Sequence, residues 1–190
     1  MPAARSRTSL LALLLSVAAL ENPGTLESAE ASPDAVLARF LGTWTTEARI
    51  RSYGPPLREA LTSGRAVCRR TLEGRYVEFR TSSVDPPGQA ELQIMTYDPG
   101  GGVYRQWVFD SDGYRHEAVG RWDPSTATLR WEGSVDGTRF VIDDHWVSRD
   151  RLQWRLMRTA GDGRLVQSIE GVVVRTITPA GGNRSPATPR

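Results

Sequence analysis

His116 is the residue of this sequence best placed to do acid–base or ligand chemistry. In an extended strand it shares a face with Tyr114, Ala118, Gly120 and Trp122, because side chains two residues apart point the same way. That face is largely apolar, so we expect it to point inward and to bring Trp122 near a ligand. An inward imidazole could contact a ligand, act as a general base or bind a metal. A hydrogen-bonded structural histidine is the alternative.

Two arginines lie in apolar runs. Arg105 is in step with Trp107 and Phe109, and Arg70 is in step with Cys68. A buried, unpaired charge is costly, so an inward arginine would need a carboxylate or the anionic head group of a ligand. We therefore predict Arg70, Arg105 and Trp107 as ligand contacts. The alternatives are an internal ion pair, or a register in which both arginines face outward.

Asp144 is a further candidate, in step with Phe140, Ile142 and Trp146. It could be the partner of either arginine or contact the ligand itself. The opposite face of the same run, residues 139–147, carries Asp143 and His145. Both faces are mixed, so the inward one is left open. The triplet of residues 143–145 matches no metal-ligand spacing, and no metal site is predicted.

Other chemistry-bearing residues have simpler interpretations. Cys68, the single cysteine, is expected to be a small buried residue rather than a nucleophile. No Gly-x-Ser-x-Gly motif is present, and the segment 110–113 is a hairpin turn rather than a calcium loop. No catalytic residue and no cofactor is predicted, which favours a non-enzymatic role.

The composition limits the partners of the chain. All 24 basic residues are arginine, which codon bias in a GC-rich genome explains, with an anion-binding surface as the alternative. The net charge is only +2 and the 22 acidic residues are interleaved with the basic ones. Nucleic-acid binding needs a continuous basic stripe, so it is not predicted.

The ends of the chain differ from the middle. Residues 1–20 have a basic start and an apolar run too short to span a bilayer, which predicts a signal peptide cleaved after Ala19 or Ala31. No membrane span is expected after its removal. Residues 21–33 are predicted to be a disordered linker, residues 34–178 a single domain, and residues 179–190 a disordered tail.

The domain is predicted to be all-β with one short helix. Ser32 is a good N-cap and Pro33 fits the first helical position, which predicts a helix up to Leu41. Regular strand and turn signals then predict an antiparallel barrel or sandwich. The expected strands are Thr43–Ser52, Gly64–Leu72, Arg75–Val84, Glu91–Tyr97, Val103–Asp110, Tyr114–Asp123, Thr128–Ser134, Arg139–Val147, Leu152–Thr159 and Leu165–Ile177.

Several short motifs occur in a familiar order: Leu41-Gly-Thr-Trp44, Leu72-Glu-Gly-Arg-Tyr-Val77, Tyr97-Asp98, Tyr104 with Trp107, Asp110-Ser-Asp-Gly113 and Gly120-Arg-Trp-Asp123. In this order the chain resembles the bacterial lipocalin-like family of domain of unknown function 1579, a calycin-type group. The resemblance covers residues 41–177. It implies an up-and-down barrel of about eight to ten strands around a lumen, and no settled activity. It also implies that Trp44 closes the base of the barrel.

Together these observations predict a secreted or periplasmic protein that holds a small hydrophobic ligand in the lumen, acidic if an arginine anchors it. One alternative is a lumen enzyme for proton-transfer chemistry of the isomerase, cyclase or hydratase type, with His116 as the base. Another is a structural barrel whose lumen is filled by side chains. The oligomeric state is left open.

Overall fold

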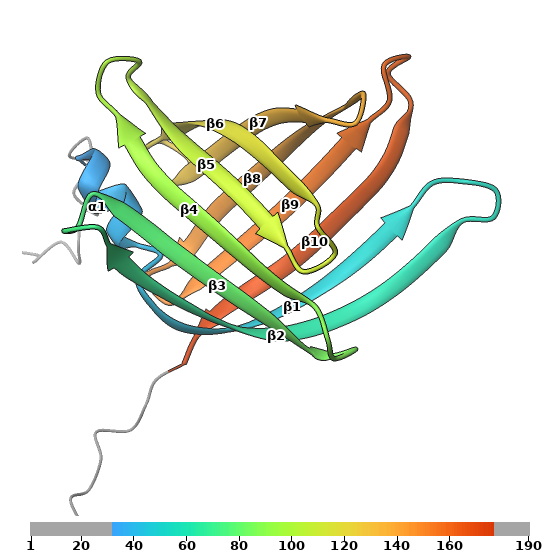
Figure 1. Ribbon diagram of the computed structural model, residues 1–190, viewed down its shortest axis with the longest axis horizontal. Helices are drawn as coiled ribbons and strands as arrows, with labels where there is room; N and C mark the ends of the chain where they lie inside the picture. Colours follow the sequence, from blue (N-terminus) through green and yellow to red (C-terminus); the bar gives the residue numbers. More distant parts are fainter. Residues whose placement is uncertain (1–31, 177–190) are drawn as a thin grey trace, which may run out of the picture.

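A computed structural model describes residues 32–176 of the chain. The predicted signal peptide, its cleavage sites and the tail lie outside these residues, as does most of the predicted linker. Within the described part, one helix is followed by ten strands that close into a barrel (Figure 1). The strands are β1 (Gly42–Ser52), β2 (Arg58–Thr71), β3 (Tyr76–Asp85), β4 (Ala90–Asp98), β5 (Val103–Asp110), β6 (Arg115–Asp123), β7 (Thr128–Val135), β8 (Thr138–Ser148), β9 (Arg151–Thr159) and β10 (Leu165–Arg175).

The helix, α1, spans Pro33–Ala38 and is shorter than predicted. The Ser32 hydroxyl accepts a hydrogen bond from the Ala35 backbone N–H, so the predicted cap is confirmed. Beyond Ala38 the chain turns rather than continuing the helix, which lets Phe40 pack into the barrel. Figure 1 shows α1 at one end of the barrel. Among residues 32–176, no helix is long and apolar enough to cross a membrane.

Every strand pairs antiparallel with its neighbours in sequence, and β1 pairs with β10 to close the sheet. The prediction of an antiparallel up-and-down barrel is confirmed. Tight turns make this meander possible. The β7–β8 turn, for example, places Asp136 and Gly137 at φ values of 47° and 73°, the left-handed region that two-residue hairpins require. Closure pairs the first strand with the last, so neither is left as an edge of the sheet.

The helix end of the barrel is closed by aromatic side chains. Trp44 is 1% exposed, and its indole N–H donates to the carbonyl of Phe40 at 2.7 Å. The guanidinium carbon of Arg175 lies 4.0 Å from the ring centroid of Trp44, and Trp146 packs on the same indole at 5.9 Å. These contacts fasten the start of β1 to the end of β10, because Arg175 is a β10 residue. The role implied for Trp44 fits this arrangement.

Candidate functional site

The lumen contains a cavity of about 310 Å³. It extends from Phe40, just after α1, to the β5–β6 turn at Ser111 and Asp112 on the opposite side of the barrel. Apolar side chains make up much of its wall, among them Ile50, Phe79, Val108, Leu152, Leu156 and Val173. A volume of this order suits one small molecule. The side chains that reach this space decide what the barrel can bind.

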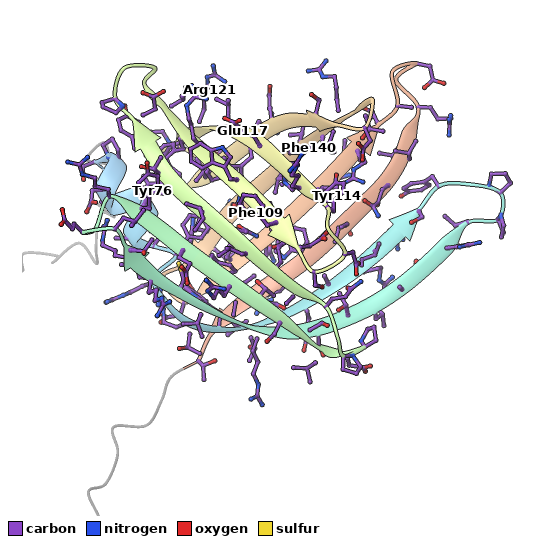
Figure 2. The ribbon with its side chains drawn as sticks, in the orientation of Figure 1. Tyr76, Phe109, Tyr114, Glu117, Arg121 and Phe140 are labelled. Atoms are coloured by element: carbon purple, nitrogen blue, oxygen red, sulfur yellow. The ribbon has the colours of Figure 1, made fainter. Side chains whose placement is uncertain are left out.

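Arg105 does not reach the lumen. The buried face of β5 carries Tyr104, Gln106 and Val108, each at most 4% exposed, so the alternate residues face outward. On the outside, Arg105 forms ion pairs with Asp98 at 3.1 Å and with Glu117 at 3.2 Å (Glu117 is labelled in Figure 2). The interpretation of Arg105 as a lumen residue is therefore wrong.

Trp107 shares the outer face with Arg105. Its cross-strand neighbours are Ile94 on β4 and Glu117 on β6, and Phe109, the next residue on this face, is 45% exposed. The expected inward position of Trp107 is also wrong. Both faces of this strand are rich in apolar side chains, because the outer surface of β4 and β5 is itself apolar. Alternation alone therefore selected the wrong face.

Arg70 faces inward but lies at the closed end. Its guanidinium donates to the carboxylate of Asp34 on α1 at 2.8 Å and to the carbonyl of Gly74 at 3.0 Å. This ion pair holds α1 against the end of β2. Arg70 does not line the cavity, so neither of the two predicted anchors contacts the lumen space.

Trp122 also faces inward near the closed end, where the guanidinium of Arg39 lies 5.1 Å from its ring centroid. It packs against the buried core and is absent from the cavity wall. Its predicted role as a ligand contact therefore has no support from its position, whereas its inward orientation is as expected.

His116 lies in the cavity wall, as predicted. Its imidazole packs against Phe140 at 4.7 Å and Tyr114 at 5.6 Å between ring centroids (both rings are labelled in Figure 2). Both ring nitrogens are buried and have no hydrogen-bond partner in residues 32–176. Burial, and secondarily the positive charge of Arg158, lowers the pKa of His116 to about 4. The imidazole is therefore neutral at physiological pH.

Asp144 also lines the cavity, which settles the inward face of β8. Its side chain is deeply buried, and its carboxylate accepts a hydrogen bond from the indole N–H of Trp131 at 2.9 Å. Burial raises the pKa of Asp144 to about 7. Of the two roles considered for Asp144, the ion pair with Arg70 or Arg105 does not form, since both arginines are paired elsewhere.

His116 and Asp144 do not form a catalytic pair in residues 32–176. No hydrogen bond joins His116 to Asp144 within the described residues, and neither group shifts the pKa of the other. Catalytic bases are normally oriented by a hydrogen-bonded carboxylate or similar group. The arrangement in the lumen therefore lacks the partner that proton-transfer chemistry on His116 would use.

Sequence reasoning missed a chain of amides in the lumen. The side-chain amide of Gln106 donates to the oxygen of Gln93 at 2.7 Å, and the amide of Gln93 donates to the carboxylate of Glu91 at 2.7 Å. All three residues line the cavity. Burial raises the pKa of Glu91. Glu91 and Gln93 alternate with Leu92 and Ile94 on β4, and alternation alone would place the apolar residues inside.

Arg158 was also missed. It follows Leu152, Trp154 and Leu156 on the inner face of β9, and their alternation with polar residues is the signal in the sequence that could have found it. Its guanidinium donates to the hydroxyl of Tyr114 at 2.6 Å and lies 5.2 Å from the Tyr114 ring centroid. Its Nε is buried without a hydrogen-bond partner in residues 32–176.

A larger and more open groove, of about 720 Å³, lies outside the lumen and crosses β1, β2, β8, β9 and β10. Much of its wall is ionised, and these groups are partly paired: Arg155 with Glu170 at 3.7 Å in the wall itself, and Arg49 with Glu59 beside it at 3.5 Å. A wide groove with charges already paired is a weaker ligand site than an enclosed apolar lumen. We therefore take the lumen as the candidate site.

Residues 30–174 match the sequence model of a family described as "Protein of unknown function (DUF1579)". The chain belongs to this family. The resemblance to domain of unknown function 1579 is confirmed, while the lipocalin-like description stays a prediction. No curated protein matches the sequence.

Two solved structures are similar in fold. Rv2717c from M. tuberculosis gives a TM-score of 0.56 at 16% identity, covering 77% of this chain and 99% of that one. The S-type phycobiliprotein lyase CPES from Guillardia theta gives a TM-score of 0.50 at 9% identity, covering 75% and 91%. At these identities the likeness is one of fold, and members of one fold differ widely in function.

Proposed function

We propose that this protein binds a small, largely hydrophobic ligand in the lumen of its barrel. The observation that carries the proposal is the cavity of about 310 Å³, with apolar walls and with buried polar atoms on His116 and Gln106 that have no partner in residues 32–176. Buried polar groups are nearly always satisfied, so such atoms facing a cavity are expected to meet a ligand or bound water. A lumen filled by side chains would leave no such space.

The sequence also suggested that the ligand is acidic and held by two arginines. Neither of these arginines contacts the cavity. Arg70 and Arg105 form ion pairs away from the cavity. Arg158 would have to serve instead, and its guanidinium is already engaged with Tyr114. The enzymatic alternative draws no support from the site, because no carboxylate of the described residues is hydrogen-bonded to His116.

The binding site can be tested by filling the lumen. Thr81 lines the cavity, whereas Ser82, the next residue on β3, is exposed on the outer surface. The neutral dye N-phenyl-1-naphthylamine should bind the wild type saturably, with enhanced fluorescence under direct excitation. We expect Thr81→Trp to weaken binding at least tenfold and Ser82→Trp to leave it unchanged. Equal binding by the two variants would place the dye outside the lumen and contradict the proposal.

The natural ligand can be sought by native mass spectrometry of the chain, expressed with its N-terminal segment in a related host and purified gently. An added mass that is lost on denaturation, and that is missing from Thr81→Trp, would identify a molecule carried in the lumen. The same added mass on Thr81→Trp would assign it to another surface.

We also propose that the chain is exported to the periplasm or secreted. The support is the pattern of residues 1–20, a basic start followed by a short apolar run. Cell fractionation followed by intact-mass measurement should find a chain that starts after Ala19 or Ala31. A chain that keeps these residues and stays in the cytoplasm would contradict export.

A further inference from the structure

The charged residues that line the cavity all carry one sign. Four acidic residues line it, Glu91, Asp110, Asp112 and Asp144, and no arginine of residues 32–176 does so. Asp110 serves mainly the β5–β6 turn, since one of its oxygens accepts from the backbone N–H groups of Asp112 and Tyr114. Asp144 and Glu91 are therefore the carboxylates that can make the interior of the barrel acidic.

Two side-chain hydrogen bonds in the lumen form a chain in which every donor faces the same end. Gln106 donates to Gln93, which donates to Glu91, so the amide orientations are set by the carboxylate at the end of the chain. This leaves the side-chain oxygen of Gln106 as an unpaired acceptor, in a residue that is only 3% exposed. A buried acceptor of this kind is satisfied by a donor from a ligand or water, not by another acceptor.

Asp144 is a second acceptor at the cavity wall. The side chain is 9% exposed, and Trp131 is the donor to its carboxylate among the side-chain hydrogen bonds of residues 32–176. No cation of the described chain pairs with it. A carboxylate ordinarily accepts several hydrogen bonds or faces a positive charge when buried. Asp144 has capacity for another donor, and the cavity lies next to it.

We propose that the lumen selects an amphipathic ligand with an apolar body and a cationic, hydrogen-bond-donating head group such as a primary amine. Asp144 is the counter-ion, and the Gln106 oxygen is a further acceptor that lines the same cavity. This inference rests on the proposed function, since it names the ligand class of the same cavity. A protonated amine carries donors and no acceptor, which matches what these two groups need.

The electrostatics of Asp144 fit the same ligand class. Without a ligand, burial raises the pKa of Asp144, and the adjacent Asp143 carboxylate raises it further. A cation within a few ångströms reverses that shift, because an opposite charge favours the ionised form. An anionic ligand would instead meet two carboxylates in the interior, with like-charge repulsion in a poorly hydrated space.

The test compares three ligands with one naphthalene body: 1-naphthylmethylamine, 1-naphthalenemethanol and 1-naphthoate. Binding is measured by calorimetry at about pH 8 on the wild type, Asp144→Asn and Asp143→Asn. Asp143 lies on the outer face of the same strand, paired with Arg130, and is the matched control. We expect the wild type to bind the amine at least tenfold more tightly than the naphthoate. Asp144→Asn should lose at least tenfold in amine affinity and keep its affinity for the alcohol, whereas Asp143→Asn should behave like the wild type.

The outcomes separate the two proposals. If the alcohol binds in the lumen but the naphthoate binds as tightly as the amine or more so, the amine selectivity is refuted while the ligand-binding barrel stands. If the amine preference survives in Asp144→Asn, Asp144 is not the counter-ion and the inference is also refuted. If none of the three ligands binds, and N-phenyl-1-naphthylamine fails as well, both proposals fail together.

Discussion

Replacing Asp144 by Asn should make the protein more stable at alkaline pH, by an amount set by the burial of the carboxyl group. The pKa of Asp144 rises from an ordinary 3.8 to about 7, chiefly because burial disfavours the ionised form. Since one pKa unit corresponds to about 1.4 kcal/mol, ionising this side chain in the folded protein costs about 4 kcal/mol relative to the unfolded chain.

The sign follows from the direction of the shift. A raised folded-state pKa contributes stability in full below the unfolded pKa, near pH 4, and that contribution is lost as the pH rises through about 7. Asn cannot ionise, and its amide oxygen can still accept from the indole N–H of Trp131. We therefore expect the wild type and Asp144→Asn to have similar stabilities near pH 4, and the variant to be more stable by up to about 4 kcal/mol near pH 8.5.

The assay is urea denaturation of both proteins across this pH range, read as the difference in the free energy of unfolding between them. Taking the difference cancels the titration of other groups, including His116 and Glu91. Asp143→Asn is the control, since it removes an exposed ion pair with Arg130 and should destabilise by at most about 1 kcal/mol. A difference for Asp144→Asn that is flat with pH, or a variant that is less stable at pH 8.5, would refute the account of Asp144 as an uncompensated buried carboxyl.

Three further predictions concern other buried positions. Because the pKa of His116 is lowered to about 4, His116→Phe should gain stability relative to the wild type as the pH falls from about 7 to 4, measured by urea denaturation; a constant difference would contradict this. Gly133→Ala should destabilise by about 1–3 kcal/mol, because a Cβ there would collide with the ring of Phe140, whereas Gly161→Ala, with open space around it, should be neutral in thermal melts. Cys68, with its pKa raised to about 12 by burial, should resist Ellman's reagent in the native protein and react once unfolded; fast native labelling would show that it is accessible.

The succession of strands could be predicted because its signals are local. Turn residues such as the Asp136-Gly137 pair adopt the left-handed backbone by themselves, and residues with positive φ recur at most strand boundaries. The strand β5 was predicted at its observed bounds, Val103–Asp110, and the cap at Ser32 was also correct. The helix was predicted three residues too long, because the pull of Phe40 into the barrel end is a tertiary contact that helix periodicity does not contain.

The inward faces were predictable only where one face of a strand is clearly apolar. On β9 the buried Leu152 and Leu156 alternate with polar residues, so the pattern in the sequence marks the inner face. On β5 it failed, since Trp107 is as apolar as the buried Tyr104 and Val108. Here apolar side chains lie on the outer surface and the polar Gln106 lies in the lumen. The difference between an apolar and a polar face, from which the inward face is inferred, is therefore absent on this strand.

By itself, the sequence determined an antiparallel series of short strands, a capped helix before it and an inward His116, because turn chemistry and side-chain alternation act over a few residues. The tertiary structure decided that β1 pairs with β10, that Arg105 lies on the outer surface and that Trp131 contacts Asp144. Each of these depends on the register between strands and on the closure of the sheet, which bring together residues that no local pattern relates. The chemical character of the lumen, with its acceptors facing an apolar cavity, is a property of that closure.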